Sequence, residues 1–342
     1  MINLGKRHII EIDVGKALGA VAVVLIHVSA YAMQNIKTFN STYKVALILN
    51  QLSRFSVPIF VLLSGVGLGL SYKKNMGYLK FLKKRLGKLI PAYIFWGLIY
   101  LIIVNKNYNY ALWPELFIKG DKIFYHLYFM PMIIKLYLIF PILYIGMKKK
   151  WGLTLAFLIS MGITTTGHYF NTPNLALDFF SKRNILFWLF YFVLGVYLSG
   201  NINYYISKIK KHKKIVRSIL LLCIIMIIWE SFYGLKIGKT LDYCTTFIRP
   251  SIIIYSIAFM AFIFSLSCNR KTLLKVSKKV TNNSYIVYLS HPFILNYYMK
   301  GFKALHLNIG SIYFIISALI MCTVIPIALG EVYKLIKKIL IL

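Results

Sequence analysis

The sequence predicts an all-α protein, a polytopic bundle of transmembrane helices. Three observations lead to this fold class: 59% of the 342 residues are hydrophobic, the mean hydropathy is +0.70, and only 14% of the residues are charged. In an average soluble domain about a quarter of the residues are charged. The charged residues of this chain are too few to cover the surface of an ordinary soluble enzyme. Intrinsic disorder is also excluded, because it requires low hydrophobicity.

Ten stretches approach the roughly 20 apolar residues that a helix needs to cross the hydrocarbon core. We place these spans at 13–33, 52–72, 89–104, 124–146, 152–166, 185–199, 215–231, 250–267, 284–299 and 310–333. The fifth, sixth and ninth are short, so a re-entrant or tilted segment is an alternative there. No connection is long enough for a soluble domain, which predicts a single integral membrane domain over residues 1–342. We expect no cleavable signal peptide, because the first span is long and no small-residue cleavage site leads into a soluble chain.

The basic residues orient these spans. The chain has 41 Lys and Arg residues but only 8 Asp and Glu, a formal net charge of +33. With the N-terminus in the cytoplasm, every long basic run falls on the cytoplasmic side, including those from Lys73 to Lys88 and from Lys208 to Arg217. Both termini are therefore predicted to be cytoplasmic. The excess positive charge suits anionic lipid headgroups, and nucleic-acid binding is not expected because no recognition fold has room.

The first predicted span carries three ionisable residues, Asp13, Lys16 and His27. Lys16 and His27 are eleven residues apart, about three helical turns, so they share one face at a separation of roughly 16 Å. Asp13 lies on the same side, within pairing reach of Lys16. We expect this polar stripe to face the bundle interior, with His27 deep in the outer half. The alternative is that Asp13 and Lys16 are interfacial anchors and that His27 makes an ordinary interhelical hydrogen bond.

Further ionisable residues lie in or beside other spans. Arg54 opens the second span near the outer surface, where its side chain could snorkel towards water. His126 is expected near the outer face, on the same side as His27. His291 falls near the centre of the ninth span, and Glu331 near the inner end of the tenth is expected to be a solvated interfacial carboxylate.

Glycines and prolines indicate packing and bends. Gly65, Gly67 and Gly69 lack the strand context and the Lys-Ser/Thr ending of a phosphate loop, so we interpret them as close helix packing. Pro131 and Pro141 are expected to bend the fourth span.

The cysteines and histidines predict no metal site. The four cysteines are far apart in sequence and are interpreted mostly as packing residues: Cys223, Cys244, Cys268 and Cys322. The seven histidines lack ligand spacing.

Six segments, in order along the chain, resemble the membrane-bound acyltransferase-3 family. They are Asp13-(x)2-Lys16-(x)10-His27, Arg54-Phe-Ser-Val-Pro58-Ile-Phe60 leading to Ser64-Gly65, Lys84-Arg85-Leu-Gly-Lys88-Leu-Ile-Pro91-Ala-Tyr93, His126-Leu-Tyr128-Phe129 with Pro141, Phe192-Val-Leu-Gly195, and Tyr288-Leu-Ser-His291-Pro292. Together they cover about residues 9 to 295. The chain departs from the family where Lys16 replaces a common Arg and Tyr128 a common Trp.

The resemblance implies the transfer of an acyl group, usually acetyl, from cytoplasmic acyl-CoA to a hydroxyl of an envelope polysaccharide or lipid-linked sugar, as in bacterial envelope-glycan O-acetyltransferases. It implies a multi-pass protein of the bacterial cytoplasmic membrane, with acyl-CoA as a co-substrate and no bound cofactor. A polysaccharide exporter is the alternative, because many spans and buried charges suit a transporter equally well.

Roles for individual residues follow from the resemblance together with the topology. His27 would be the general base, or alternatively a transient acyl-histidine, with Lys16 and Asp13 supporting it. The coenzyme phosphates would bind Arg85 and Lys88 on the cytoplasmic side. The residues expected to contact the acceptor are Arg54, His126, Tyr128 and His291. Alternatively, Arg54 and His126 would bind the developing oxyanion, and His291 would line the passage for the acyl group.

Overall fold

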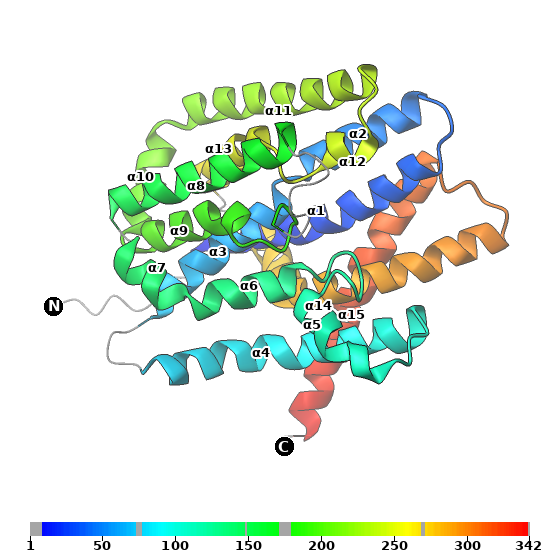
Figure 1. The fold of residues 1–342 in the computed structure, drawn as a ribbon, viewed down its shortest axis with the longest axis horizontal. Helices are drawn as coiled ribbons and strands as arrows, with labels where there is room; N and C mark the ends of the chain where they lie inside the picture. The colour runs from blue at the N-terminus through cyan, green and yellow to red at the C-terminus, as the bar shows by residue number, and fades with distance from the viewer. Residues whose placement is uncertain (1–8, 73–76, 148, 171–178, 268–270, 341–342) are drawn as a thin grey trace. The chain divides into compact units, whose positions relative to one another are not determined.

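The computed structural model describes residues 9–72, 77–147, 149–170, 179–267 and 271–340. Lys73 and Cys268, singled out above, lie outside these ranges. The predicted all-α fold class is confirmed, since every regular element among the described residues is a helix (Figure 1). The α-helices are α1 (Ile10–Gln34), α2 (Ser41–Leu52), α3 (Ser56–Ser71), α4 (Tyr78–Ile99), α5 (Trp113–Lys119), α6 (Phe129–Leu138), α7 (Phe140–Gly146), α8 (Lys150–Tyr169), α9 (Leu186–Ser199), α10 (Ile202–Lys211), α11 (Lys213–Lys236), α12 (Leu241–Thr245), α13 (Pro250–Ser265), α14 (Lys271–Ala304) and α15 (Ile312–Leu340). A π-helical turn, Tyr100–Val104, extends α4, and a short 3-10 turn, Tyr110–Leu112, precedes α5.

Six helical stretches among the described residues are long and apolar enough to cross a membrane: Ile10–Gln34, Ser41–Ser71, Tyr78–Val104, Lys213–Lys236, Leu241–Ser265 and Ile312–Ile336. Two bent helix pairs, α6 with α7 and α9 with α10, raise this number to eight if each pair is one span. The predicted spans 152–166 and 284–299 lie within α8 and α14, which are helical but do not belong to this set. The chain is therefore a multi-pass membrane protein, while ten spans and two cytoplasmic ends stay predictions.

Large apolar side chains project outwards from several helices. On α11, Leu222 is 65% exposed and Trp229 is 63% exposed, and α15 presents Ile316 and Ile320 in the same way. Extended apolar surface of this kind is rare on soluble monomers and suits contact with lipid chains.

The expectation that residues 34–51 form a connection between spans is wrong, because most of this stretch is the helix α2. The Asn40 side chain caps the helix by accepting a hydrogen bond from the Tyr43 backbone N–H at 2.9 Å. Ala46 and Leu47 on the same helix are fully buried. A local cap and a buried apolar face therefore extend the second span towards the N-terminus.

Proline has different effects at different positions. The axis bends by 55° between α6 and α7, where Pro141 occupies the first turn of α7, so the predicted bend is confirmed there. Pro131 lies in the first turn of α6, where a missing N–H has no cost. Pro292 lies inside α14, which continues through it.

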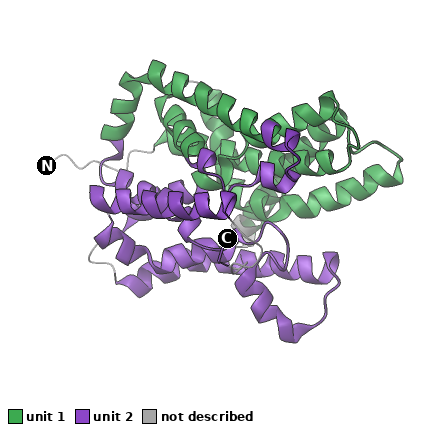
Figure 2. Cartoon of the chain, turned by 45° about the horizontal axis from the view of Figure 1, so that its top comes forward, with its two compact units in different colours: residues 1–59, 204–232, 254–342 green, residues 60–203, 233–253 purple. Residues whose placement is uncertain are grey.

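The helices form two compact units, which Figure 2 shows in different colours. Unit 1 comprises residues 1–59, 204–232 and 254–342, and unit 2 comprises residues 60–203 and 233–253. Within unit 1, α1 packs against α2, α14 and α15. Within unit 2, α8 packs along α9, and α4 contacts α6.

Small residues allow a close helix crossing inside unit 2. A methyl group on Gly65 of α3 would overlap the backbone of α9, and one on Gly195 of α9 would overlap the backbone of α3. Gly69 also lies against α9, whereas the space around Gly67 is open. The packing interpretation is therefore confirmed for Gly65 and Gly69 but is wrong for Gly67.

Candidate functional site

The three ionisable residues of the first span lie on one uninterrupted helix. α1 begins with acidic residues in its first turn, which suits the positive end of the helix dipole, and it contains no proline. Asp13, Lys16 and His27 are all half-buried on this helix. The predicted helical spacing of the stripe is thus retained.

α14 lies beside this stripe. In the first turn of α1, the Asp13 backbone carbonyl accepts a hydrogen bond from the hydroxyl of Thr281 of α14 at 2.7 Å. Further along both, the ring centroids of His27 and His291 lie 5.2 Å apart at an interplanar angle of 31°. The two contacts occur in the same order along each helix, so α1 and α14 run parallel. The fold therefore pairs two histidines that the sequence analysis selected separately.

The two rings differ in accessibility. His291 is completely buried, and its Nδ1 lies 2.9 Å from the backbone carbonyl of Val287. A carbonyl can only accept, so we assign the proton to Nδ1 and the lone pair of the neutral ring to Nε2. His27 is only half-buried. The arrangement is an accessible imidazole beside a buried imidazole that its own helix holds in place.

Arg54 is attached to the same region of α1 through Asn50. Both Nε of Arg54, at 3.0 Å, and its Nη2 donate to the Asn50 side-chain oxygen. The Asn50 side-chain nitrogen in turn donates to the Ile26 carbonyl and to the Ser29 hydroxyl, each at 3.0 Å. These groups place a buried cation next to the helical turn that carries His27.

The expectation that Arg54 snorkels to the surface is wrong, since Arg54 is only 5% exposed. The physical reason is Asn50, which supplies an acceptor inside the protein, so the guanidinium does not need water. Sequence reasoning missed Asn50 because it assigned residue 50 to a connection. The available signal was an Asn-Gln pair at positions 50 and 51 next to an apolar run.

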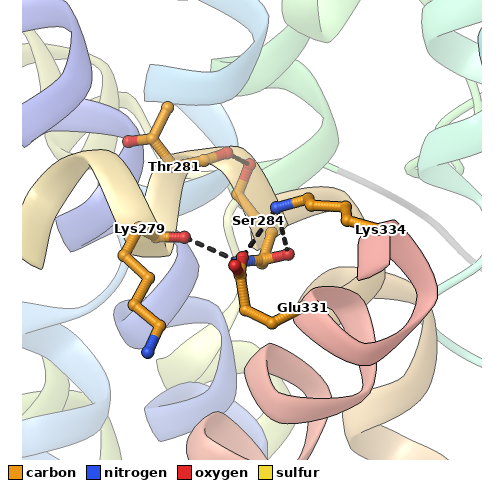
Figure 3. A network of polar contacts seen from close by, with 6 residues as sticks. Lys279, Thr281, Ser284, Glu331 and Lys334 are labelled. Carbon is orange, nitrogen blue, oxygen red and sulfur yellow. Dashed lines mark hydrogen bonds and ion pairs between the residues drawn. The ribbon is translucent and has the colours of Figure 1, made fainter. Parts of the chain in front are cut away.

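A second polar network of unit 1 joins α14 to α15 (Figure 3). The side chain of Asn283, 2% exposed, donates to a Glu331 carboxylate oxygen at 2.6 Å and to the Lys279 carbonyl at 2.8 Å. Lys334 Nζ lies 2.8 Å from both the Glu331 carboxylate and the Asn283 side-chain oxygen. The Glu331 side chain is 41% exposed, as expected for an interfacial carboxylate, and it also joins two helices.

Contacts at the two ends of unit 1 agree with the predicted sidedness. Lys210, from a connection predicted to be cytoplasmic, pairs with Glu11 at 2.6 Å in the first turn of α1. At the other end, Gly310, the first residue of the predicted span 310–333, lies against the backbone of Asn35, which belongs to a connection predicted to be outside. His27 follows Glu11 by sixteen residues, which is about 24 Å along the helix.

The predicted coenzyme residues Arg85 and Lys88 belong to α4 in unit 2. Arg85 is half-buried, lies 5.8 Å from the centroid of the Phe81 ring and donates from Nη2 to the Ser71 hydroxyl. Lys88 is exposed. Neighbouring side chains thus hold the Arg85 side chain in position, whereas Lys88 extends from the helix.

His126 and Tyr128 have different environments in unit 2. His126 is 2% exposed, and three aromatic rings surround it, those of Tyr100, Phe124 and Tyr125, at centroid distances of 5.4, 5.8 and 5.7 Å. Tyr128, two residues later, lines a cavity of about 560 Å³. An acceptor-binding role for both stays a prediction.

Comparison with known proteins identifies the family. Residues 9–331 match the sequence profile of a family described as an acyltransferase domain. The chain belongs to this family. The resemblance stated from the six sequence segments is therefore confirmed, and the match continues through Glu331.

Several bacterial relatives share less than a quarter of their residues with this chain. A protein of Staphylococcus aureus strain N315, named as a probable poly-beta-1,6-N-acetyl-D-glucosamine export protein, is 24% identical over 255 residues, covering 71% of this chain and 69% of the relative. A Bacillus subtilis protein, YfiQ, whose name describes a putative membrane-bound acyltransferase, is 23% identical over 309 residues, covering 83% of this chain and 80% of the relative. A Staphylococcus epidermidis protein, also named as a probable export protein for that glycan, is 22% identical over 302 residues, covering 85% of this chain and 82% of the relative. No solved structure matches the chain.

Proposed function

We propose that this protein is an O-acyltransferase of the bacterial cytoplasmic membrane. It moves an acyl group, acetyl by preference, from cytoplasmic acyl-CoA to a hydroxyl of an envelope polysaccharide or lipid-linked sugar. The observation that carries the proposal is the pairing of His27 with His291 on two parallel helices, in a chain that belongs to an acyltransferase family.

His27 acts as the general base in this proposal. Transfer from a thioester requires removal of the hydroxyl proton and stabilisation of the oxyanion that forms. His27 takes the proton as the hydroxyl oxygen attacks the thioester carbonyl. The C–O bond forms, the C–S bond breaks, and the proton passes to the leaving thiolate. Histidine suits this role because a free imidazole titrates near neutral pH.

The neighbouring groups would assist in different ways. The buried imidazole ring of His291 restricts the orientation of the His27 ring. The buried guanidinium of Arg54 favours negative charge in its surroundings. Asp13 and Lys16 lie on the same helix face as His27, nearer the end proposed to be cytoplasmic, and support His27 from there. An alternative mechanism makes His27 the nucleophile, with a transient acyl-histidine.

The acyl donor is proposed to contact Arg85 and Lys88. A guanidinium that neighbouring side chains already orient loses little freedom when it binds a phosphate, and an exposed lysine can follow the ligand as a mobile point charge. The two residues lie three positions apart on α4, so they are near neighbours on the helix surface.

The test uses purified protein in liposomes, with labelled acetyl-CoA and an added glycan. His27→Ala should reduce acetyl transfer by about 10²-fold or more, the usual contribution of general-base catalysis. The matched control is His212→Ala, because His212 is exposed and lies outside the proposed site. If His27→Ala protein that remains folded retains more than about a tenth of the activity, the base role is wrong.

The second candidate function is polysaccharide export, which the names of the staphylococcal relatives favour. The same liposomes separate the two. Label on the glycan supports the enzyme. Movement of glycan across the bilayer without any need for acyl-CoA supports the exporter and contradicts the proposal.

A further inference from the structure

Unit 2 contains a cavity of about 560 Å³, within the size range of ligand pockets. Three segments of the chain line it. The first is the turn that follows α5, the second is the end of α8 together with residues 180–182, and the third is α12 with the residues after it. The sequence analysis predicted none of this, apart from an acceptor role for Tyr128.

Aromatic rings form one part of the cavity lining. The rings of His168 and Tyr243 stack with their centroids 4.1 Å apart and an interplanar angle of 21°. His168 is only 8% exposed, so the surrounding protein restricts the position of its ring. Tyr125 and Tyr128 add two more rings to the lining. Each ring of the stacked pair covers one face of the other, and Lys239 Nζ lies 5.3 Å from the Tyr243 centroid. Aromatic rings with a polar edge suit the apolar face of a sugar ring and leave its hydroxyls free to bond elsewhere.

Two carboxylates form another part of the lining. Asp121 and Asp242 are two of only eight acidic residues in a chain of net charge +33, and both line this cavity. Arg183 lies 3.6 Å from the Asp121 carboxylate and helps to hold it. Lys182 contributes one cation to the lining. Arg183 offsets the charge of Asp121, whereas the exposed Asp242 can accept hydrogen bonds from hydroxyl and amide groups and disfavours an anionic glycan beside it.

The position of the lining in the sequence agrees with an acceptor site. Apart from Tyr125 and Tyr128, which lie at the outer end of the predicted span 124–146, the lining residues belong to the connections that follow the third, fifth and seventh predicted spans. The charge pattern assigns all three connections to the outer side. An envelope glycan is found on that side. The coenzyme candidates on α4 belong to a connection assigned to the cytoplasmic side.

We infer that this cavity binds a sugar residue of an uncharged or amino-sugar glycan, through the stacked His168–Tyr243 pair and the carboxylates Asp121 and Asp242. The inference rests on the proposed function, in that it supplies the acceptor subsite for acyl transfer.

The first test measures glycan binding without any acyl donor. Full-length protein in lipid nanodiscs is titrated with a fluorescent β-1,6-linked N-acetylglucosamine oligosaccharide. Tyr243→Ala should weaken binding by about tenfold, a typical effect of losing an aromatic contact, and Tyr243→Phe should bind like the wild type. The matched control is Tyr108→Ala, because Tyr108 is 57% exposed and lies outside the lining. Equal binding by Tyr243→Ala and wild type would overturn the inference.

The second test concerns the charge of the glycan. The wild type should bind the N-acetylglucosamine oligosaccharide more tightly than an oligogalacturonate of equal length, and Asp242→Asn should reduce this preference. Equal affinities for the two glycans in the wild type would contradict the role of the carboxylates.

Transfer kinetics separate the two proposals. In the acetyl-transfer assay, Tyr243→Ala should raise KM for the glycan and leave KM for acetyl-CoA unchanged. Glycan binding that depends on Tyr243, in a protein that transfers no acetyl group, would overturn the proposed function and keep the sugar site. Normal acetyl transfer with glycan binding independent of Tyr243 would do the reverse.

Discussion

The histidine pair of unit 1 and the cavity of unit 2 are built in different ways. His27 and His291 come from the interiors of two long helices, and backbone contacts on those helices hold the surrounding groups. The cavity is lined by helix ends, a five-residue helix and connecting segments. Long helices fix side chains accurately, whereas connections vary easily and present polar groups to a ligand. In the two proposals made above, unit 1 holds the reacting groups and unit 2 recognises the acceptor.

The regions also differ in how they keep polar groups inside the protein. Around α1, one asparagine supplies hydrogen bonds to an arginine, a carbonyl and a hydroxyl, all of them buried. Around the cavity, Tyr125, Lys182 and Asp242 are exposed and can reach solvent. Substitutions in the first region should therefore affect folding strongly, and substitutions around the cavity should affect mainly binding.

The largest effect on stability is expected from Asn50→Leu in unit 1. This change removes one acceptor of the buried Arg54 guanidinium, and a hydrogen bond to a charged group typically contributes about 1.5–3 kcal/mol. The Asn50 hydrogen bonds to Ile26 and Ser29 are lost as well, which adds to this cost. The measurement is the free energy of unfolding in detergent micelles. Asn50→Asp is the control, because it keeps an acceptor for Arg54 and should recover part of the loss. A change below about 1 kcal/mol for Asn50→Leu would mean that Arg54 does not depend on Asn50.

A smaller effect is expected in unit 2 from Gly195→Ala. The added methyl group would overlap the Leu62 carbonyl across the α3–α9 crossing, and overpacking of this kind typically costs about 1–3 kcal/mol. Gly67→Ala is the matched control, because no other atom lies within 4 Å of an added methyl group there. It should be neutral or slightly stabilising, since alanine has the higher helix propensity. Similar melting temperatures for the two alanine variants would contradict the close crossing.

The sequence predicted features that repeat along a helix or depend on composition. The all-α fold follows from apolar content, and the alignment of Lys16 with His27 follows from the helical repeat. It did not predict the role of Asn50, because residues 50 and 51 are polar in isolation and become fully buried only through packing against other helices. The cavity was missed for a related reason. Its lining comes from three segments that are distant in sequence, and no local sequence pattern indicates that these segments lie together in the fold.

The smallest effects are expected from two surface carboxylates, one in each unit. Glu331 accepts a hydrogen bond from the buried Asn283, whereas Glu115 of α5 pairs with Lys119 at 2.5 Å on an exposed helix surface. Glu331→Ala removes one of the two acceptors of the buried Asn283 side-chain amide, so it should lower the melting temperature more than Glu115→Ala does. Interactions of exposed charged side chains contribute little to stability, so both substitutions should lower the melting temperature less than Gly195→Ala does.

The pH dependence of the Glu115 variant sharpens this last comparison. The hydrogen bond from Lys119 and its charge lower the pKa of Glu115. A lowered pKa in the folded state stabilises the protein above the pKa of the unfolded chain, and this contribution disappears as the pH falls through the folded value. The difference in melting temperature between wild type and Glu115→Ala should therefore decrease on acidification, and also in high salt, which screens exposed charges. If Glu115→Ala lowered the melting temperature more than Glu331→Ala at neutral pH, the exposed pair of unit 2 would matter more than the buried donor of unit 1, and the contrast drawn between the two units would be wrong.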